Sequence, residues 1–325
     1  MIRVLVCVAS VITSLFATAA PVRADDYPSR PITIVVPYPA GGPTDEAARL
    51  VANSLSKQFN ENVVVENVSG GGTIIATNKV AKAEPNGYTL LLPNLQISAN
   101  PSLYEQLPFD TAKDLTPVIL INRNPLLLVG RKSLEPNSLS ELMTASKAKS
   151  LKAAIAGYGT TGHLATVMLE QESHTKFDLI PYRGGAPILT DLLGEHIDLF
   201  FGTPQQLLPH IKAGKLKVYG ATSKEPLPDL PNVASFINLF GPKLEIYYWQ
   251  ALFAPAGTPS PVLAKLNRAV ASMLEDPTVL AVWSHEGVSA FPKDQRSIEA
   301  AEIFFRDEMG RWGRLIRDNN IKIER

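Results

Sequence analysis

Three glycine-rich turns combine the residue types that bind anions. They read Tyr38-Pro-Ala-Gly-Gly-Pro-Thr-Asp45, Gly157-Tyr-Gly-Thr-Thr-Gly-His163 and Tyr182-Arg-Gly-Gly-Ala-Pro187. Each follows a segment that predicts a strand and precedes one that predicts a helix, so backbone N–H groups are free and the helix dipole adds positive potential. None has the Lys-Ser/Thr pair of a P-loop or the full spacing of a dinucleotide-binding turn. The pattern therefore favours a carboxylate as the bound anion.

Three side chains in these turns each allow two interpretations. Asp45 can stabilise the first turn of a helix, by roughly 0.3–1 kcal/mol, and it can also face a ligand that brings a donor or cation, or accept from an ordered water, because these roles are compatible. His163 can orient its turn or donate to a ligand oxygen. Arg183 can bind a carboxylate through two guanidinium N–H groups, or form an ion pair with Asp191 or Glu195.

Catalytic and metal chemistry have little support in the sequence. It contains no Gly-x-Ser-x-Gly nucleophile motif, and its five histidines are scattered singly without metal-ligand spacing. We therefore expect a protein that is not an enzyme and has no catalytic residue, metal or cofactor. A secreted hydrolase or lyase using Asp45 and His163 is the catalytic alternative.

The N-terminal segment is typical of a secretory signal. Met1-Ile-Arg3 is positive, residues 4–20 are mostly apolar, and Val22-Arg-Ala24 fits a cleavage site. Cleavage at 1–24 removes the single cysteine, Cys7, and leaves 29 basic and 31 acidic residues, a net charge of −2. No basic field remains to bind nucleic acid, and no later segment is apolar enough for membrane insertion. The mature protein is expected in the periplasm.

Apolar strands alternate with amphipathic helices along the mature chain. This alternation predicts an α/β fold with doubly wound, mainly parallel sheets flanked by helices. A second set of elements repeats the plan of the first after residue 125. The expected strands are 31–36, 62–66, 88–92, 118–122, 126–129, 151–156, 177–181, 197–201 and 215–219, and the expected helices include 44–58, 161–171 and 187–193.

The C-terminal part returns to helix. Ser260 is expected as an N-cap with Pro261 in the first turn, and a last helix is expected over 294–319. The Met and aromatic residues of this tail, and Trp249, are assigned to the core. The tail has no predicted sheet, so it should pack on the first unit. The chain then crosses between units near 122–124 and 247–250, which permits a hinge. Lobe 1 would be 25–124 plus 247–325, and lobe 2 would be 125–246.

An ordered series of motifs resembles one known family. The chain resembles the extracytoplasmic receptors of tripartite tricarboxylate transporters, the Bug family. The motifs are Pro37-Tyr-Pro-Ala-Gly-Gly-Pro-Thr-Asp45, Glu66-Asn-Val-Ser-Gly-Gly-Gly-Thr73, Pro85-Asn-Gly-Tyr-Thr-Leu-Leu91, Asn100-Pro-Ser-Leu-Tyr104, Gly162-His-Leu-Ala165, Pro181-Tyr-Arg-Gly-Gly-Ala-Pro187, Asp191-Leu-Leu-Gly194, Pro209-His-Ile-Lys-Ala-Gly-Lys215 and Ala254-Pro-Ala-Gly-Thr-Pro259.

The resemblance implies a two-lobed Venus-flytrap that captures a small mono- or dicarboxylate. It also implies delivery to a permease with a large and a small membrane subunit. A ligand-presenting adaptor of a sensor kinase is an alternative with the same fold, and we expect a monomer. The resemblance carries ligand contacts to Tyr38, Ala40, Gly41, Thr44, Asp45, Thr73 and Asn94 in lobe 1, and to Tyr158, Gly159, Thr160, Thr161, Gly162, His163, Arg183, Gly184 and Thr203 in lobe 2.

Three segments depart from the family pattern at the expected cleft. They are Tyr158, the segment Gly202-Thr-Pro-Gln205 and the segment Leu92-Pro-Asn-Leu-Gln96. Tyr158 suggests a narrowed pocket or stacking on a flat ligand, such as an aromatic dicarboxylate. These departures bear on the identity of the ligand and leave its chemical class unchanged.

Overall fold

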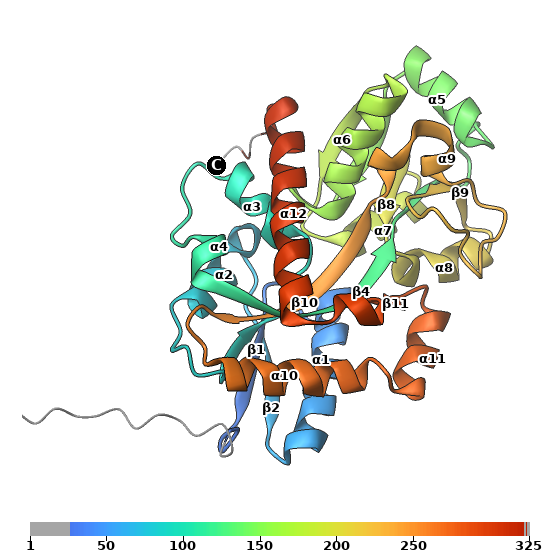
Figure 1. Ribbon diagram of the computed structural model, residues 1–325. Helices are drawn as coiled ribbons and strands as arrows, with labels where there is room; N and C mark the ends of the chain where they lie inside the picture. Colours follow the sequence, from blue (N-terminus) through green and yellow to red (C-terminus); the bar gives the residue numbers. More distant parts are fainter. Residues whose placement is uncertain (1–26, 322, 324–325) are drawn as a thin grey trace, which may run out of the picture.

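The computed structural model describes residues 27–321 and residue 323 (Figure 1). The expected leader at 1–24, with Cys7, lies outside these residues. Within the part of the chain that is described, no helix combines the length and the apolar character that crossing a bilayer requires.

The strands form two sheets. The first sheet has the order β11-β4-β10-β3-β1-β2, and the second has the order β7-β6-β8-β5-β9. We refer to the parts of the molecule built on them as the first half and the second half. The strands are β1 (Ile32–Val36), β2 (Val63–Asn67), β3 (Thr89–Leu91), β4 (Leu115–Pro125), β5 (Leu127–Arg131), β6 (Leu151–Ile155), β7 (Phe177–Pro181), β8 (Leu199–Gly202), β9 (Leu216–Ala221), β10 (Tyr247–Pro255) and β11 (Ser289–Ala290).

Both sheets are mixed. β1 runs parallel to β2 and β3, and β6 runs parallel to β7 and β8. β10 is antiparallel to β3 and β4, and β5 is antiparallel to β8 and β9. The α/β fold with two sheets is confirmed, whereas the expectation of mainly parallel pairing is wrong. Parallel neighbours need a crossover connection. β5 and β10, with which the chain passes into the other sheet, have no such connection to their neighbours and pair with them in antiparallel fashion.

Helices flank both sheets (Figure 1). Short 3-10 turns at 71–73, 242–244 and 293–295 supplement them. The α-helices are α1 (Pro43–Phe59), α2 (Ile74–Ala81), α3 (Gln96–Leu103), α4 (Thr111–Asp114), α5 (Leu139–Ala148), α6 (Thr161–Ser173), α7 (Gly185–Leu193), α8 (Pro204–Lys212), α9 (Phe236–Phe240), α10 (Ser260–Met273), α11 (Pro277–His285) and α12 (Ile298–Asp318).

The C-terminal tail packs on the first half, as expected. α10 lies on α1 and β4, and α12 lies on α3 and β4. The tail also adds the short strand β11 to the edge of the first sheet, beside β4, and this strand was not expected. Helix α11 was also missed, because only Val279 and Trp283 of it are buried and its sequence lacks a regular apolar stripe.

The start of α10 differs by one residue from the expectation. Pro259 occupies the N-cap position with an extended ψ of 134°, and Ser260 is already helical. The assignment of Ser260 as N-cap is therefore wrong. The apolar stripe of this helix is buried as expected, including Leu266 and Met273.

The chain passes between the sheets twice. β4 ends at Pro125 and β5 begins at Leu127, and the return to the first sheet is made by β10 from Tyr247. β4 and β10 lie side by side along their length where the halves meet (Figure 1). The lobe boundaries at 124/125 and 246/247 stay a prediction, because sheet membership does not show that the halves move as separate bodies.

Candidate ligand-binding site

Four polar side chains lie on one face of the two crossing strands. Tyr248 is paired with Asn124, and Gln250 with Asn122, across the antiparallel β4–β10 ladder. Residues directly opposite each other share a face, as do residues two apart. Asn122, Asn124 and Gln250 are each no more than 3 % exposed. We call these four residues the polar strand face.

Helix α12 packs against the opposite face of the same strands. Trp249, which pairs with Arg123, is buried, and its indole N–H donates to Glu308 Oε2 at 2.7 Å. Trp312 donates to the same oxygen at 2.8 Å. The assignment of Trp249 to the core is confirmed, and the crossing strands separate this core from the polar strand face.

The turn between β1 and α1 is tied to the polar strand face by hydroxyl and amide groups. The Tyr38 hydroxyl donates to Asn94 Oδ1 at 2.6 Å, and Asn94 Nδ2 donates to the Tyr248 hydroxyl at 3.1 Å. The Thr44 hydroxyl lies 2.7 Å from the same Tyr248 oxygen. Burial raises the pKa of both Tyr38 and Tyr248, so both phenols are neutral hydrogen-bonding groups at pH 7.

Asp45 is hydrogen-bonded to its own turn, to the next turn of α1 and to the end of β2. Its carboxylate accepts from the backbone N–H of Gly41, from Arg49 Nε and from Asn67 Nδ2, each at 2.9 Å. Burial disfavours the charged form, but these hydrogen bonds outweigh it and the pKa of Asp45 is lowered. These contacts show Asp45 stabilising the start of α1, and its contact with a ligand stays a prediction. Ala40 and Gly41 themselves are exposed.

The turn before α2 lies close to this network. Thr73 is buried at a φ of 79°, and its hydroxyl accepts from Asn100 Nδ2 at 2.8 Å. A Cβ placed on Gly72 would lie 3.7 Å from Gln96 Nε2. Gln96 Oε1 in turn accepts from the Tyr38 hydroxyl at 3.3 Å. Gln96 is therefore bonded to the turn before α1 and lies near the turn before α2.

In the second half, the turn that starts α6 folds onto His163. The backbone N–H of Gly159 donates to His163 Nδ1 at 3.0 Å, and the Tyr158 ring packs edge-on against the imidazole at 5.3 Å between centroids. Burial lowers the pKa of His163 to about 4, so the imidazole is neutral at pH 7. Of the two interpretations of His163, the structure shows orientation of the turn. Asp45 and His163 each accept a backbone N–H of the turn that precedes them, and the catalytic alternative that would use them stays a prediction.

Two threonine hydroxyls at helix N-termini remain unpaired. Thr161 begins α6 and Thr203 is the N-cap of α8, and both are buried without a side-chain hydrogen-bond partner among the described residues. A Cβ on Gly162 would lie 2.8 Å from the carbonyl oxygen of Phe201, so the N-terminus of α6 lies against the end of β8. The neighbouring Thr160 hydroxyl donates to Gly157 O at 2.7 Å. Two N-termini with positive potential thus lie near each other.

Arg183 and Gly184 are placed at the start of α7. Gly184 is its N-cap at a φ of 112°, with nothing within 4 Å of the position of a Cβ. Arg183 is exposed and forms no ion pair within residues 27–321. The alternative of a pair with Asp191 or Glu195 is wrong, because Asp191 accepts from Tyr182 and Glu195 from Ser133. This leaves the guanidinium available to an anion.

Of the predicted residues of the first half, Thr44 and Asn94 contact the polar strand face directly and Tyr38 reaches it through Asn94, and this face lies on segments expected only as chain crossings. A weak signal was present in the sequence: Asn122 and Asn124, and Tyr248 and Gln250, are polar residues two apart in segments that are otherwise rich in apolar residues. No group of three or more His, Cys, Asp or Glu side chains that could hold a metal is present among the residues described.

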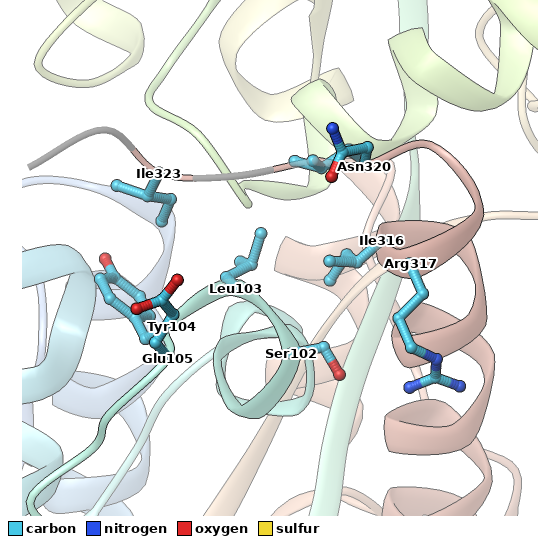
Figure 2. Close-up of a pocket in the computed structure, with 9 residues that line it drawn as sticks. Ser102, Leu103, Tyr104, Glu105, Ile316, Arg317, Asn320 and Ile323 are labelled. Atoms are coloured by element: carbon cyan, nitrogen blue, oxygen red, sulfur yellow. The ribbon is translucent and has the colours of Figure 1, made fainter.

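A separate cavity of about 450 Å³ lies between α3 and the end of α12 (Figure 2). Leu103 and Ile316 project into it (Figure 2). Leu103 is also the side chain that a Cβ on Gly159 would strike. The glycine turn of the second half therefore rests directly on α3 of the first half.

Two sheets joined by paired crossing strands, with the turn before α1 and the start of α8 both bonded to one polar face, form the architecture of a two-lobed periplasmic binding protein. Residues 47–321 match the model of the tripartite tricarboxylate transporter family receptor, TctC. The chain belongs to this family, and the resemblance noted from the sequence motifs is confirmed.

Curated relatives support the assignment over nearly the whole chain. The UPF0065 protein in the TAR-I ttuE-ttuC' intergenic region of Agrobacterium vitis is 36% identical over 294 residues, 90% of this chain and 85% of the relative. Protein BugT of Bordetella pertussis is 32% identical over 327 residues, 98% of both chains.

Solved structures show the same fold, and two of them hold carboxylates. The periplasmic binding protein BugD is 33% identical, with a TM-score of 0.83 over 91% of this chain and 100% of its own. R. palustris Rpa4515 with adipate is 30% identical, with a TM-score of 0.84 over 92% and 100%. MatC of Rhodopseudomonas palustris with bound malate is 31% identical, with a TM-score of 0.80 over 89% and 100%.

Proposed function

We propose that this protein captures a small carboxylate between its two halves without changing it chemically. The observation that carries the proposal is the polar strand face. It lies between the α1 turn, which Thr44 and Asn94 tie to Tyr248, and the N-terminus of α8, which contacts Asn124 through Gln205. The adipate and malate held by two similar proteins support the same ligand class.

The energetics require contacts from both halves. One helix N-terminus contributes about 1 kcal/mol and one hydrogen bond to a charged group about 1.5–3 kcal/mol. Micromolar affinity needs about 8 kcal/mol. A single turn is therefore insufficient, and several donors must close on the carboxylate together. We propose that residues 25–124 with 247–325, and residues 125–246, are the two lobes that close.

Within this site we assign direct contacts and supporting roles. Side-chain polar groups and backbone donors contact the ligand, while Asp45 and His163 hold two glycine turns in shape. Direct contacts are proposed for Tyr38, Ala40, Gly41, Thr44, Asn94, Tyr158, Thr160, Thr161, Gly162, Arg183, Gly184 and Thr203, with Thr73 and Gly159 shaping the turns beside them.

The family also supports a place for the protein in transport. We propose that it works in the periplasm and hands its ligand to the large and small membrane subunits of a tripartite permease. Membership of the transporter receptor family supports both statements.

Thermal denaturation with a panel of carboxylates tests the proposal. A ligand that binds only the folded state stabilises it by about 2.7 kcal/mol at a hundredfold excess over Kd. We expect a raised Tm with at least one acid, and recovery of that acid unchanged. A flat response across mono-, di- and tricarboxylates, or turnover of the bound acid, would contradict the proposal.

A further inference from the structure

A relay of side-chain amides connects the polar strand face with both halves. Asn124 Nδ2 donates to Gln205 Oε1 at 3.3 Å, and Gln205 Nε2 donates to Glu286 Oε2 at 3.0 Å. Asn124 lies on β4, Gln205 on α8 of the second half, and Glu286 at the end of α11 in the first half. The relay therefore exists only while the halves are together.

The carboxylate of Glu286 fixes the direction of the whole relay. An ionised carboxylate only accepts hydrogen bonds, so the amide nitrogen of Gln205 must face Glu286. Its oxygen then faces Asn124, and Asn124 must turn its own nitrogen toward Gln205. The carbonyl oxygen Oδ1 of Asn124 is then left without a partner among the described residues. The assignment of this atom as the oxygen of the amide follows from the hydrogen-bonding chemistry of Gln205 and Glu286.

This free oxygen is a buried acceptor. Asn124 is 1 % exposed, and its Oδ1 has no hydrogen-bond partner among the described residues. The same is true of Oδ1 of Asn122, two positions earlier on the same face, at 3 % exposure. A buried acceptor without a donor is costly. A guest held against the polar strand face is stabilised if it brings a donor to these oxygens.

The charges near the relay are of the same sign. Burial, and then the neighbouring charge of Glu286, raises the pKa of Glu46 on α1, which places a second acid beside Glu286. Arg49, on the same helix, is paired with Asp45. Among the described residues, Glu286 forms no ion pair. The two acids favour a donor group on the guest, including a cationic one, while Gln250 Nε2 on the same face, unpaired among the described residues, can donate to an acceptor such as a hydroxyl or carboxylate oxygen.

We infer that Asn124 selects a carboxylic acid that also carries a hydrogen-bond donor, a hydroxyl or an ammonium group, on its carbon chain. The inference rests on the proposed function and narrows its ligand class. The glycine turns and helix N-termini hold the carboxylate, and the Asn124 oxygen accepts from the donor. An acid without that donor leaves the oxygen unpaired in the closed protein, which lowers its affinity.

Calorimetric titration with matched acids tests the inference. The mature chain, freed of bound ligand, is titrated with succinate, L-malate and L-aspartate, and with the corresponding five-carbon acids and benzoates. These sets differ only in hydrogen, hydroxyl or amino substitution. In the preferred set we expect a substituted acid to bind about tenfold more tightly than the unsubstituted one, the change that one net hydrogen bond produces. The hydroxy and amino arms show which donor is used.

Three variants connect the preference to Asn124. Asn124→Leu should reduce the preference for the substituted acid to about threefold or less, mainly by weakening the binding of that acid. Gln205→Met should also reduce it, because the Asn124 amide is then free to rotate, and this variant leaves the crossing strands intact if Asn124→Leu does not fold. Asn78→Leu is the matched control, since Asn78 Oδ1 on α2 is likewise buried without a partner among the described residues. It should keep the full preference.

The outcomes separate the two proposals. Binding of no acid in any set would overturn the proposed function and this inference with it. Equal affinity for substituted and unsubstituted acids would overturn the inference alone. A preference that persists in both Asn124→Leu and Gln205→Met would remove Asn124 as its cause.

Discussion

Asp45 accepts the backbone N–H of Gly41 at 2.9 Å, from a position four residues later in the chain. The second half repeats this arrangement, because His163 accepts the N–H of Gly159, also four residues earlier. Both glycines have a φ near 80°, and both acceptors lie in the first turn of a helix. Two different side chains therefore fix equivalent glycine turns. This relationship gives several predictions with distinct signatures.

Replacing Asp45 by Asn should destabilise the fold by about 2 kcal/mol at pH 7, because charged hydrogen bonds to Arg49 and Gly41 are weakened. The pKa of Asp45 is lowered from 3.8 in the folded protein, so its contribution is present above pH 3.8 and is lost as pH falls through the lower folded value. Urea unfolding of both proteins from pH 7 to pH 3 measures this. A difference in the free energy of unfolding that stays constant down to pH 3 would contradict this prediction.

His163 should give a pH dependence in a different window. Its pKa is lowered from 6.5 to about 4, so the unfolded chain binds a proton between these values while the folded protein does not. Folding stability is then complete above pH 6.5 and falls as pH decreases toward 4, by up to about 3 kcal/mol. His163→Gln keeps an acceptor but does not titrate. Denaturant unfolding should show a flatter profile for this variant between pH 6.5 and 4.

Gly159→Ala should cost more stability than Gly41→Ala. Both residues have a positive φ, which costs an alanine about 1–2 kcal/mol, but only at Gly159 would the new Cβ strike Leu103. Gly41 has open space and is the matched control. The double variant Gly159→Ala with Leu103→Ala should recover the excess cost. Thermal unfolding of the unsubstituted protein, Gly159→Ala, Leu103→Ala and the double variant forms a double-mutant cycle. Additive changes in the free energy of unfolding would show that the contact does not matter.

Glu308→Ala should destabilise the junction between α12 and the crossing strands. It leaves the indole N–H groups of Trp249 and Trp312 unpaired in the core, at a cost of about 1–3 kcal/mol for each. Glu308→Gln retains a carbonyl acceptor and should lose less. Tryptophan fluorescence during urea unfolding reports both effects. Equal loss in the two variants would indicate that the charge, and not the shared acceptor, is what these indoles need.

Local patterns predicted most of the elements. β1, α1 and α6 lie within two residues of their expected bounds, because apolar periodicity and glycine turns are properties of short segments. The same reasoning missed α11, which buries only Val279 and Trp283. It also missed β10, and with it the antiparallel pairing of β10 with β3 and β4, because these partners lie far apart along the chain.

The sequence by itself determined the alternation of strands and helices, the glycine turns, and the family to which their ordered motifs belong, since each is encoded by neighbours along the chain. Only the tertiary structure decided which polar groups share a face. Thr44 is hydrogen-bonded to Tyr248, which lies 204 positions away in the sequence, and Asn124 to Gln205, which lies 81 positions away. Such partners are chosen by strand register and helix packing, and no local propensity specifies them.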